Sequence, residues 1–169
     1  MNFNAHKVPD DQSITEHNLF ERANQEWDAG NVEKAFELFN LAASEGDTYA
    51  LNSIGYFFDH GIGMSKDREK ALSWYRKAAK SGDSCAYSNI GLVHRDSGNI
   101  RRAKFWLSKA VDEGDGDAAL ELAKLHLQGP SKRSRELAMK YLQVASKSDS
   151  ITQASREEAE LLLKDVARI

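Results

Sequence analysis

The stretch TYALNSIGYFFDHGIGMSKDREKALSWYRKAAKSGD, residues 48–83, decides the fold of this chain. Its second half carries apolar residues at i, i+3, i+4, i+7 and i+8, the spacing of one face of a helix. They are Ala71, Trp74, Tyr75, Ala78 and Ala79. Asp67 can cap this helix, and Gly82 can end it. Gly55 lies among large apolar residues in the first half, where its missing side chain lets another helix approach closely. The stretch therefore predicts two antiparallel helices joined by a loop.

The same pattern recurs along the chain, as it does in repeat proteins. Each predicted second helix holds two alanines at i and i+7, with a candidate N-cap before them and a large apolar residue at i+3. The alanine pairs are Ala35 and Ala42, Ala71 and Ala78, Ala103 and Ala110, and Ala138 and Ala145. The candidate caps are Asn31, Asp67, Asn99 and Ser134, and the large residues are Leu38, Trp74, Trp106 and Tyr141. We expect the two tryptophans to lie in the core.

Small residues occupy two further positions of the repeat. A Gly-Asp pair ends the second helix in three copies, at Gly46, Gly82 and Gly114, whereas the fourth copy has Asp149-Ser150 there. The first helices have a small residue where the paired helices should meet, and these residues are Ala23, Gly55, Gly91 and Ala123. So many matches in one register favour a stacked array of similar units.

The pattern predicts an all-α fold, a solenoid of about four helix-turn-helix repeats closed by a C-terminal capping helix. We expect a single repeat domain over residues 14–169. The predicted repeats span about 14–47, 48–83, 84–115 and 116–150, and the predicted capping helix spans 152–168. Residues 1–13 are polar and show no helical period, so we interpret them as a flexible N-terminal arm.

Composition excludes several classes of function. The chain has 169 residues and a formal net charge of −3, which gives no overall attraction to nucleic acid or to an anionic membrane. Its one cysteine, Cys85, rules out an intramolecular disulfide framework. The sequence shows neither an apolar run long enough to span a membrane nor a secretory signal. We therefore expect a cytoplasmic protein.

The second copy resembles the Sel-1-like repeat, a relative of the tetratricopeptide repeat. The matching segments are Ala50-Leu51-Asn52, Ile54-Gly55-Tyr56, Gly61-Ile62-Gly63, Asp67, Lys70-Ala71-Leu72, Trp74-Tyr75, Lys77-Ala78-Ala79 and Gly82-Asp83. The resemblance implies a right-handed α-solenoid. It also implies an adaptor, a chaperone-like partner or a regulator, and not a catalyst. Some secreted bacterial members carry a cysteine pair in each repeat, which this chain lacks.

In related solenoids the first helix of each pair lines the concave surface, so the resemblance also indicates a binding site. The predicted partner-binding residues are Phe20, Asn24, Trp27, Tyr49, Asn52, Tyr56, Asp59, Leu92, Arg95 and Lys124. The same register places His60 and Leu120 on this surface. We expect the aromatic residues to anchor a partner and Arg95 to favour an acidic group on it. The alternative is that some of these aromatics pack between repeats.

Other chemistry has weaker support in the sequence. Gly61-Ile62-Gly63 lacks the remaining residues of a phosphate loop, and no histidine pair has a metal-ligand spacing within one helix. Cys85 is interpreted as a structural thiol. Basic residues cluster in the last two copies, where we interpret them as solvated charges on second helices and loops. They are Arg101, Arg102, Lys104, Lys132, Arg133 and Arg135.

The sequence therefore favours a protein–protein interaction module, an adaptor or regulator that binds a partner segment in the concave groove. The alternative is a bacterial immunity protein that binds and inhibits a cognate secreted toxin. An enzyme is less expected, and we predict no catalytic residue, cofactor, metal, nucleic acid or membrane contact. The identity of the partner and the oligomeric state stay open.

Overall fold

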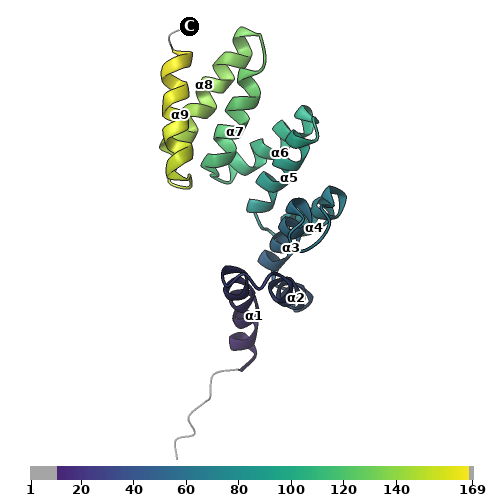
Figure 1. Ribbon diagram of the computed structural model, residues 1–169. Coiled ribbons are helices and arrows are strands. Elements are labelled where there is room, and N and C mark those ends of the chain that lie inside the picture. The colour runs from purple at the N-terminus through teal and green to yellow at the C-terminus, as the bar shows by residue number, and fades with distance from the viewer. Residues whose placement is uncertain (1–10, 168–169) are drawn as a thin grey trace, which may run out of the picture. The chain divides into compact units, whose positions relative to one another are not determined.

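The computed structural model describes the backbone of residues 11–167 and the side chains of residues 19–167. This part of the chain forms nine α-helices and contains no β-strand (Figure 1). The helices are α1 (Asp11–Asp28), α2 (Val32–Ser44), α3 (Thr48–His60), α4 (Arg68–Lys80), α5 (Cys85–Asp96), α6 (Ile100–Asp112), α7 (Gly116–Leu127), α8 (Lys132–Lys147) and α9 (Gln153–Val166). The predicted all-α repeat fold is confirmed.

Contacts between residues divide the chain into two compact units, Met1–Ala78 and Ala79–Ile169. In the first unit α1 packs against α2, and α2 packs against α3. In the second unit each helix from α5 to α9 packs against the next, and α9 also touches α7. Each unit therefore consists of neighbouring helices that follow one another along the chain.

One predicted boundary, the start of the first helix, shifts in the structure. The helix α1 begins at Asp11, so residues 11–13 of the predicted arm belong to it, whereas residues 1–10 lie outside the described residues. The capping helix is α9, which buries Ala159 and Val166 in a cluster with residues of α7 and α8.

The core is built on the contact between a small residue of each first helix and a large residue of the second. A Cβ added to Gly55 would lie 2.6 Å from the Tyr75 ring, and one added to Gly91 would lie 2.7 Å from Cγ of Leu107. Tyr75 and Leu107 are fully buried. Both follow the first alanine of their helix at i+4. Ala23 and Ala123 are likewise buried, in clusters that hold the i+4 residues Phe39 and Leu142.

The prediction that the large residue at i+3 is the core residue is therefore wrong. Trp74 and Trp106 are only half-buried. Trp106 stacks on Tyr87 with ring centroids 5.9 Å apart, and Lys77 lies 4.0 Å from the Trp74 ring centroid. Residues i+3 and i+4 both belong to the apolar stripe of the second helix. The small residue of the first helix approaches i+4 most closely, so i+4 lies at the centre of the contact between the two helices.

The Gly-Asp pairs form the joints between successive repeats. Gly46, Gly82 and Gly114 adopt positive φ angles of 102°, 96° and 92°, which favour glycine. The aspartate that follows each glycine then accepts from backbone N–H groups at the start of the next helix. Oδ1 of Asp47 accepts hydrogen bonds from the backbone N–H groups of Tyr49 and Ala50, at 2.9 and 3.0 Å. Asp115 caps α7 in the same way, whereas Asp83 lies one residue before the N-cap of α5, Ser84, and accepts from the backbone N–H of Cys85 at 3.0 Å.

The start of α8 also differs from the prediction. Ser131, and not Ser134, is the N-cap, because its hydroxyl accepts from the backbone N–H of Ser134 at 3.0 Å. The helix consequently begins about one turn earlier, at Lys132. Asp67 and Asn99 cap α4 and α6 as predicted, whereas the Asn31 side chain makes no capping bond to α2.

Gly55→Ala is expected to lower the free energy of unfolding by about 1–3 kcal/mol, because the added methyl group overlaps the Tyr75 ring. This loss opposes the roughly 1 kcal/mol that alanine gains over glycine inside a helix. Urea unfolding followed by circular dichroism measures the change. In a Tyr75→Leu background the loss should shrink. Equal losses in both backgrounds, or a gain in stability, would contradict the contact.

Candidate functional site

The predicted site residues of the first unit meet on one surface formed by α1 and α3. We call it the aromatic surface, and it consists of Phe20, Trp27, Tyr49, Tyr56 and His60. The ring centroids of Phe20 and Tyr49 lie 6.2 Å apart, and those of Trp27 and Tyr56 lie 5.7 Å apart. His60 stacks on Tyr56 at 3.9 Å and completes the row. The register of the first helices therefore brings these side chains together.

The exposed members of the aromatic surface are Tyr49, Tyr56 and His60. Tyr49 is 62% exposed and Tyr56 is 39% exposed, whereas Phe20 and Trp27 are half-buried. Trp27 stands edge-on to the buried Phe57, with centroids 4.5 Å apart, and Phe20 contacts Phe39 at 5.6 Å. Phe20 and Trp27 consequently connect the surface to the core. Phe20 and Trp27 pack within the unit and also border the exposed tyrosines, and their contact with a partner stays a prediction.

The polar residues predicted for this site have different surroundings. Asn24 is exposed, and its Nδ2 donates to the Phe20 carbonyl at 3.0 Å, while Asn52 is half-buried. Asp59 is half-buried, with its carboxylate 3.7 Å from Arg68 and 3.9 Å from Lys66. These two cations offset the negative charge of Asp59.

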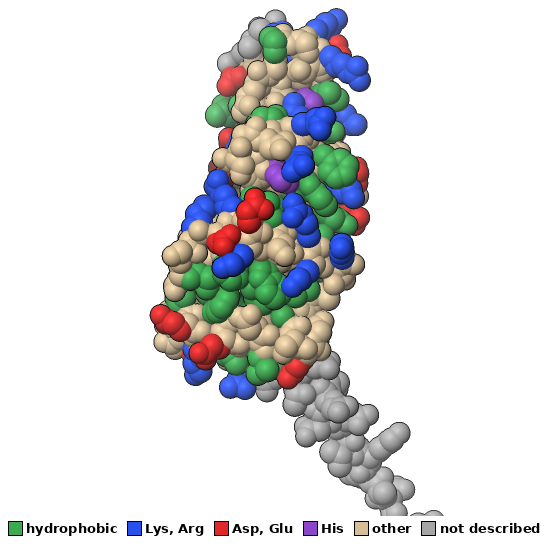
Figure 2. All heavy atoms as spheres, turned by 90° about the vertical axis from the view of Figure 1, so that its right-hand side faces the viewer, with side chains coloured by type: hydrophobic (Ala, Val, Ile, Leu, Met, Phe, Trp, Pro, Cys, Tyr) green, Lys and Arg blue, Asp and Glu red, His purple; other side chains and the backbone are tan. Residues whose placement is uncertain are grey.

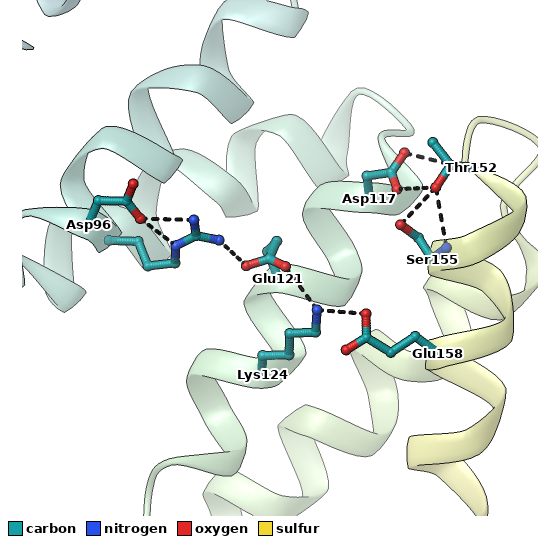
Figure 3. A network of polar contacts seen from close by, with 8 residues as sticks. Asp96, Asp117, Glu121, Lys124, Thr152, Ser155 and Glu158 are labelled. Carbon is teal, nitrogen blue, oxygen red and sulfur yellow. Dashed lines mark hydrogen bonds and ion pairs between the residues drawn. The ribbon is translucent and has the colours of Figure 1, made fainter. Parts of the chain in front are cut away.

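The predicted residues of the second unit, Leu92, Arg95 and Lys124, come from α5 and α7. Leu92 is half-buried and packs against the cluster around Leu107. Arg95 and Lys124 belong to an alternating row of charges, drawn in Figure 3, which we call the charge ladder. It runs Asp96, Arg95, Glu121, Lys124 and Glu158, across α5, α7 and α9.

The geometry of the charge ladder ties three helices together. Arg95 binds Asp96 at 2.8 Å and also binds Glu121. Lys124 binds Glu121 at 3.1 Å and Glu158 at 2.8 Å. Partial burial alone would lower the pKa of Arg95 and of Lys124, but their bonds to carboxylates outweigh it and raise both. An acidic group on a partner would therefore compete with carboxylates of this chain.

Other residues considered as candidates from the sequence do not form a binding or catalytic site. Leu120 is 2% exposed and is buried in a cluster with Ala159 and Val166 of α9, so its predicted position on the binding surface is wrong. Burial, and then the charges of Asp83 and Asp115, raise the pKa of the exposed Cys85 thiol, which does not favour a reactive thiolate. Among the described residues, no group of three or more His, Cys, Asp or Glu side chains could hold a metal ion.

Sequence reasoning missed an open cleft of about 550 Å³ among α6, α7 and α8. The sequence pattern favoured solvated charges at Arg101 and Lys104, and it gave no prediction for Lys109 or Phe105. The available signal was the position of Phe105, a large apolar residue outside the helical stripe and next to cations.

The fold and the aromatic surface define a helical-hairpin repeat protein that presents aromatic side chains on its first helices. A family model for the Sel1 repeat matches residues 28–47, 48–83, 91–115 and 116–150, together more than half of the chain. The chain therefore belongs to the Sel1 repeat family, as the resemblance of residues 48–83 indicated.

Known proteins support this membership. The Sel1-repeat-containing protein YjcO of Escherichia coli strain K12 is 34% identical over 102 residues, which cover 58% of this chain and 42% of that protein. The ERAD-associated E3 ubiquitin-protein ligase component HRD3B of Arabidopsis thaliana is 29% identical over 101 residues, covering 59% of this chain and 16% of that protein. The chain thus spans less than half of the length of these relatives.

Solved structures agree with the fold. A Sel1 repeat protein from Oxalobacter formigenes superimposes with a TM-score of 0.72 at 27% identity, covering 89% of this chain and 61% of that one. The protective antigen c5321 of uropathogenic Escherichia coli displays an SLR fold. It superimposes with a TM-score of 0.77 at 22% identity, covering 89% of this chain and 33% of that one. Within the described residues, no helix combines the length and apolar character needed to cross a membrane.

Glu121→Gln tests the charge ladder, because Glu121 is the carboxylate that Arg95 and Lys124 share. We expect a loss of about 0.5–1 kcal/mol at low ionic strength, since the groups involved are partly exposed. The loss should shrink at high salt, where the charges are screened. Urea unfolding at two salt concentrations measures it. Glu160→Gln, at an exposed position of α9, is the matched control. If both variants lose the same amount, the ladder does not stabilise the unit.

Proposed function

We propose that this chain is a protein-binding module, an adaptor or regulator, that takes a segment of a partner protein on the aromatic surface. The observation that carries the proposal is the exposure of Tyr49 and Tyr56 beside half-buried aromatic rings. Tyrosine and tryptophan are enriched among the residues that dominate the energy of protein interfaces. Two such tyrosines, about two turns apart on α3, offer a partner a row of anchors.

Neighbouring rings hold these tyrosines in place, which favours binding. Tyr56 is held between Trp27 and His60, and Tyr49 rests against Phe20. Since these rings are already positioned, a partner would immobilise few rotatable bonds, which lowers the entropic cost of association. Asn24, exposed on α1, lies one turn from Phe20 and supplies an amide for hydrogen bonds to a partner backbone.

The family supports the same class of function. Sel1 repeats generally serve as protein-interaction modules, and repeat folds of this kind are typically non-catalytic. One relative is described as a component of a ubiquitin-protein ligase, which is an assembly of several proteins. We extend to this chain only the general role, which is to hold a protein partner without catalysing a reaction.

Affinity capture from the source cell tests the proposal with a double variant, Tyr49→Ala with Tyr56→Ala. Loss of interface anchors of this type costs about 2 kcal/mol or more, so the partner should bind about thirtyfold more weakly. Both side chains are exposed, so the variant should keep its helical circular dichroism signal. This pair is preferable to Trp27→Ala, which would also remove a contact with Phe57.

The matched control is Val144→Ala with Leu161→Ala, which removes exposed apolar side chains from the second unit. A protein captured by the wild type and by the control, and lost with the tyrosine variant, supports the proposal. Capture of the same proteins by all three chains would exclude the aromatic surface as the binding site. If the partner is an enzyme that is inactive in the complex, the chain acts as an inhibitor.

A further inference from the structure

The second unit carries an open cleft of about 550 Å³ that differs in chemistry from the aromatic surface. We call it the basic cleft. It is lined by cations from α6, namely Arg101, Lys104 and Lys109, and by the rings of Phe105, His126 and Tyr141. Figure 2 shows one face of the molecule on which Lys and Arg side chains lie close to hydrophobic and histidine side chains.

The cations of the basic cleft lack the partners that the cations of the charge ladder have. Among the described residues, none of Arg101, Lys104 and Lys109 forms an ion pair with a carboxylate. Asp112 is the carboxylate that lines the cleft. The ladder, by contrast, pairs each cation with two carboxylates. Positive charge in the cleft is therefore available to a ligand.

Two of these cations are held in place by uncharged neighbours. Lys109 lies over the ring of Phe105 at 5.2 Å and over the rings of Trp106 and Tyr87 at 5.3 and 5.5 Å. Lys104 lies 3.4 Å from Nδ1 of His126. Burial, and then the charge of Lys104, lower the pKa of His126, which favours the neutral ring, whose Nδ1 can accept from the ammonium group. Both contacts position a cation without neutralising it.

The cleft also offers an apolar contact surface. Phe105 is 55% exposed, and it stands edge-on to Trp106 with centroids 5.4 Å apart. Tyr141 is half-buried and stacks against His126 at 5.7 Å. A ligand that combines negative charge with one large apolar side chain would match both the cations and these rings.

We propose that the basic cleft binds an acidic protein segment with a large apolar side chain among its carboxylates. Charge complementarity is the argument for this occupant, since three unpaired cations border exposed aromatic surface. The proposal concerns a different unit from the aromatic surface and stands independently of the function proposed above.

Nucleic acid fits the basic cleft less well. Proteins that bind DNA tightly typically neutralise about six to ten phosphates. This cleft supplies three unpaired cations and includes the carboxylate of Asp112, which would repel a phosphate. A short acidic segment needs fewer cations and can present its apolar side chain to Phe105.

Fluorescence anisotropy tests the proposal with a short fluorescein-labelled peptide of Glu and Asp residues around one central Phe. The comparison peptide has Gln and Asn in the same order, and single-stranded oligothymidine is the nucleic-acid probe. The cleft variant is Arg101→Glu with Lys104→Glu. The matched control is Arg102→Glu with Arg133→Glu, at exposed positions that do not line the cleft but change the net charge equally. Circular dichroism checks that both variants fold.

We expect the acidic peptide to bind at least about tenfold more weakly to the cleft variant than to the wild type and the control. Phe105→Ala should also weaken binding, and the neutral peptide should bind at least about tenfold more weakly than the acidic one. Equal binding of the acidic peptide to the cleft variant and the control would overturn the proposal. Tighter binding of oligothymidine, with displacement of the acidic peptide, would also overturn it and assign the cleft to nucleic acid.

Discussion

The close approach of paired helices at a small residue is the constraint on which the rest of the structure depends. At Gly55 and Gly91 the facing side chain occupies the space that a Cβ would fill. A contact this tight sets the rotation of both helices about their axes, because turning either one would drive a larger residue into its neighbour. The residues that each helix presents to solvent follow from that rotation. Packing thus sets which positions of α3 and α6 face solvent, including those of the exposed tyrosines and of the α6 cations.

Much of the fold could be predicted from the sequence because its signals are local. The alanine spacing, the Gly-Asp joints and the glycine turns all act within a few residues, and the structure confirms the helices that they predict. The predictions of the core residue and of one N-cap failed because two residues close in sequence fitted each position equally well. Trp74 and Tyr75 both lie on the apolar stripe, and only the approach of Gly55 selects Tyr75. Ser131 and Ser134 are both good caps, and the structure uses the earlier one.

The candidate sites were harder to predict because exposure and pairing depend on distant residues. Leu120 is buried in the cluster that includes Ala159 of the final helix, which its local pattern cannot show. Lys124 meets Glu158, 34 residues away, so its charge is already matched within the unit. Tyr49 and Tyr56 were placed on the surface correctly, since the first-helix register applies to both. Their packing against residues of α1 could be inferred from the repeat, but their degree of exposure could not.

The two sets of cations in the second unit show how structure and ligand binding can be distinguished. The charge ladder stabilises contacts among α5, α7 and α9, so folding alone accounts for its residues. In the basic cleft, Lys104 and Lys109 contact uncharged side chains, and among the described residues none of the cleft's cations forms an ion pair with a carboxylate. Arg101 lies in the first turn of α6 and Lys104 in the next turn, near the helix N-terminus where the dipole disfavours positive charge, and no acidic residue compensates in the first turn. Like charges gathered at the unfavourable end of a helix cost stability unless an anion joins them. A bound carboxylate would offset both the mutual repulsion and the dipole, which is why this surface is better explained by a ligand than by the fold.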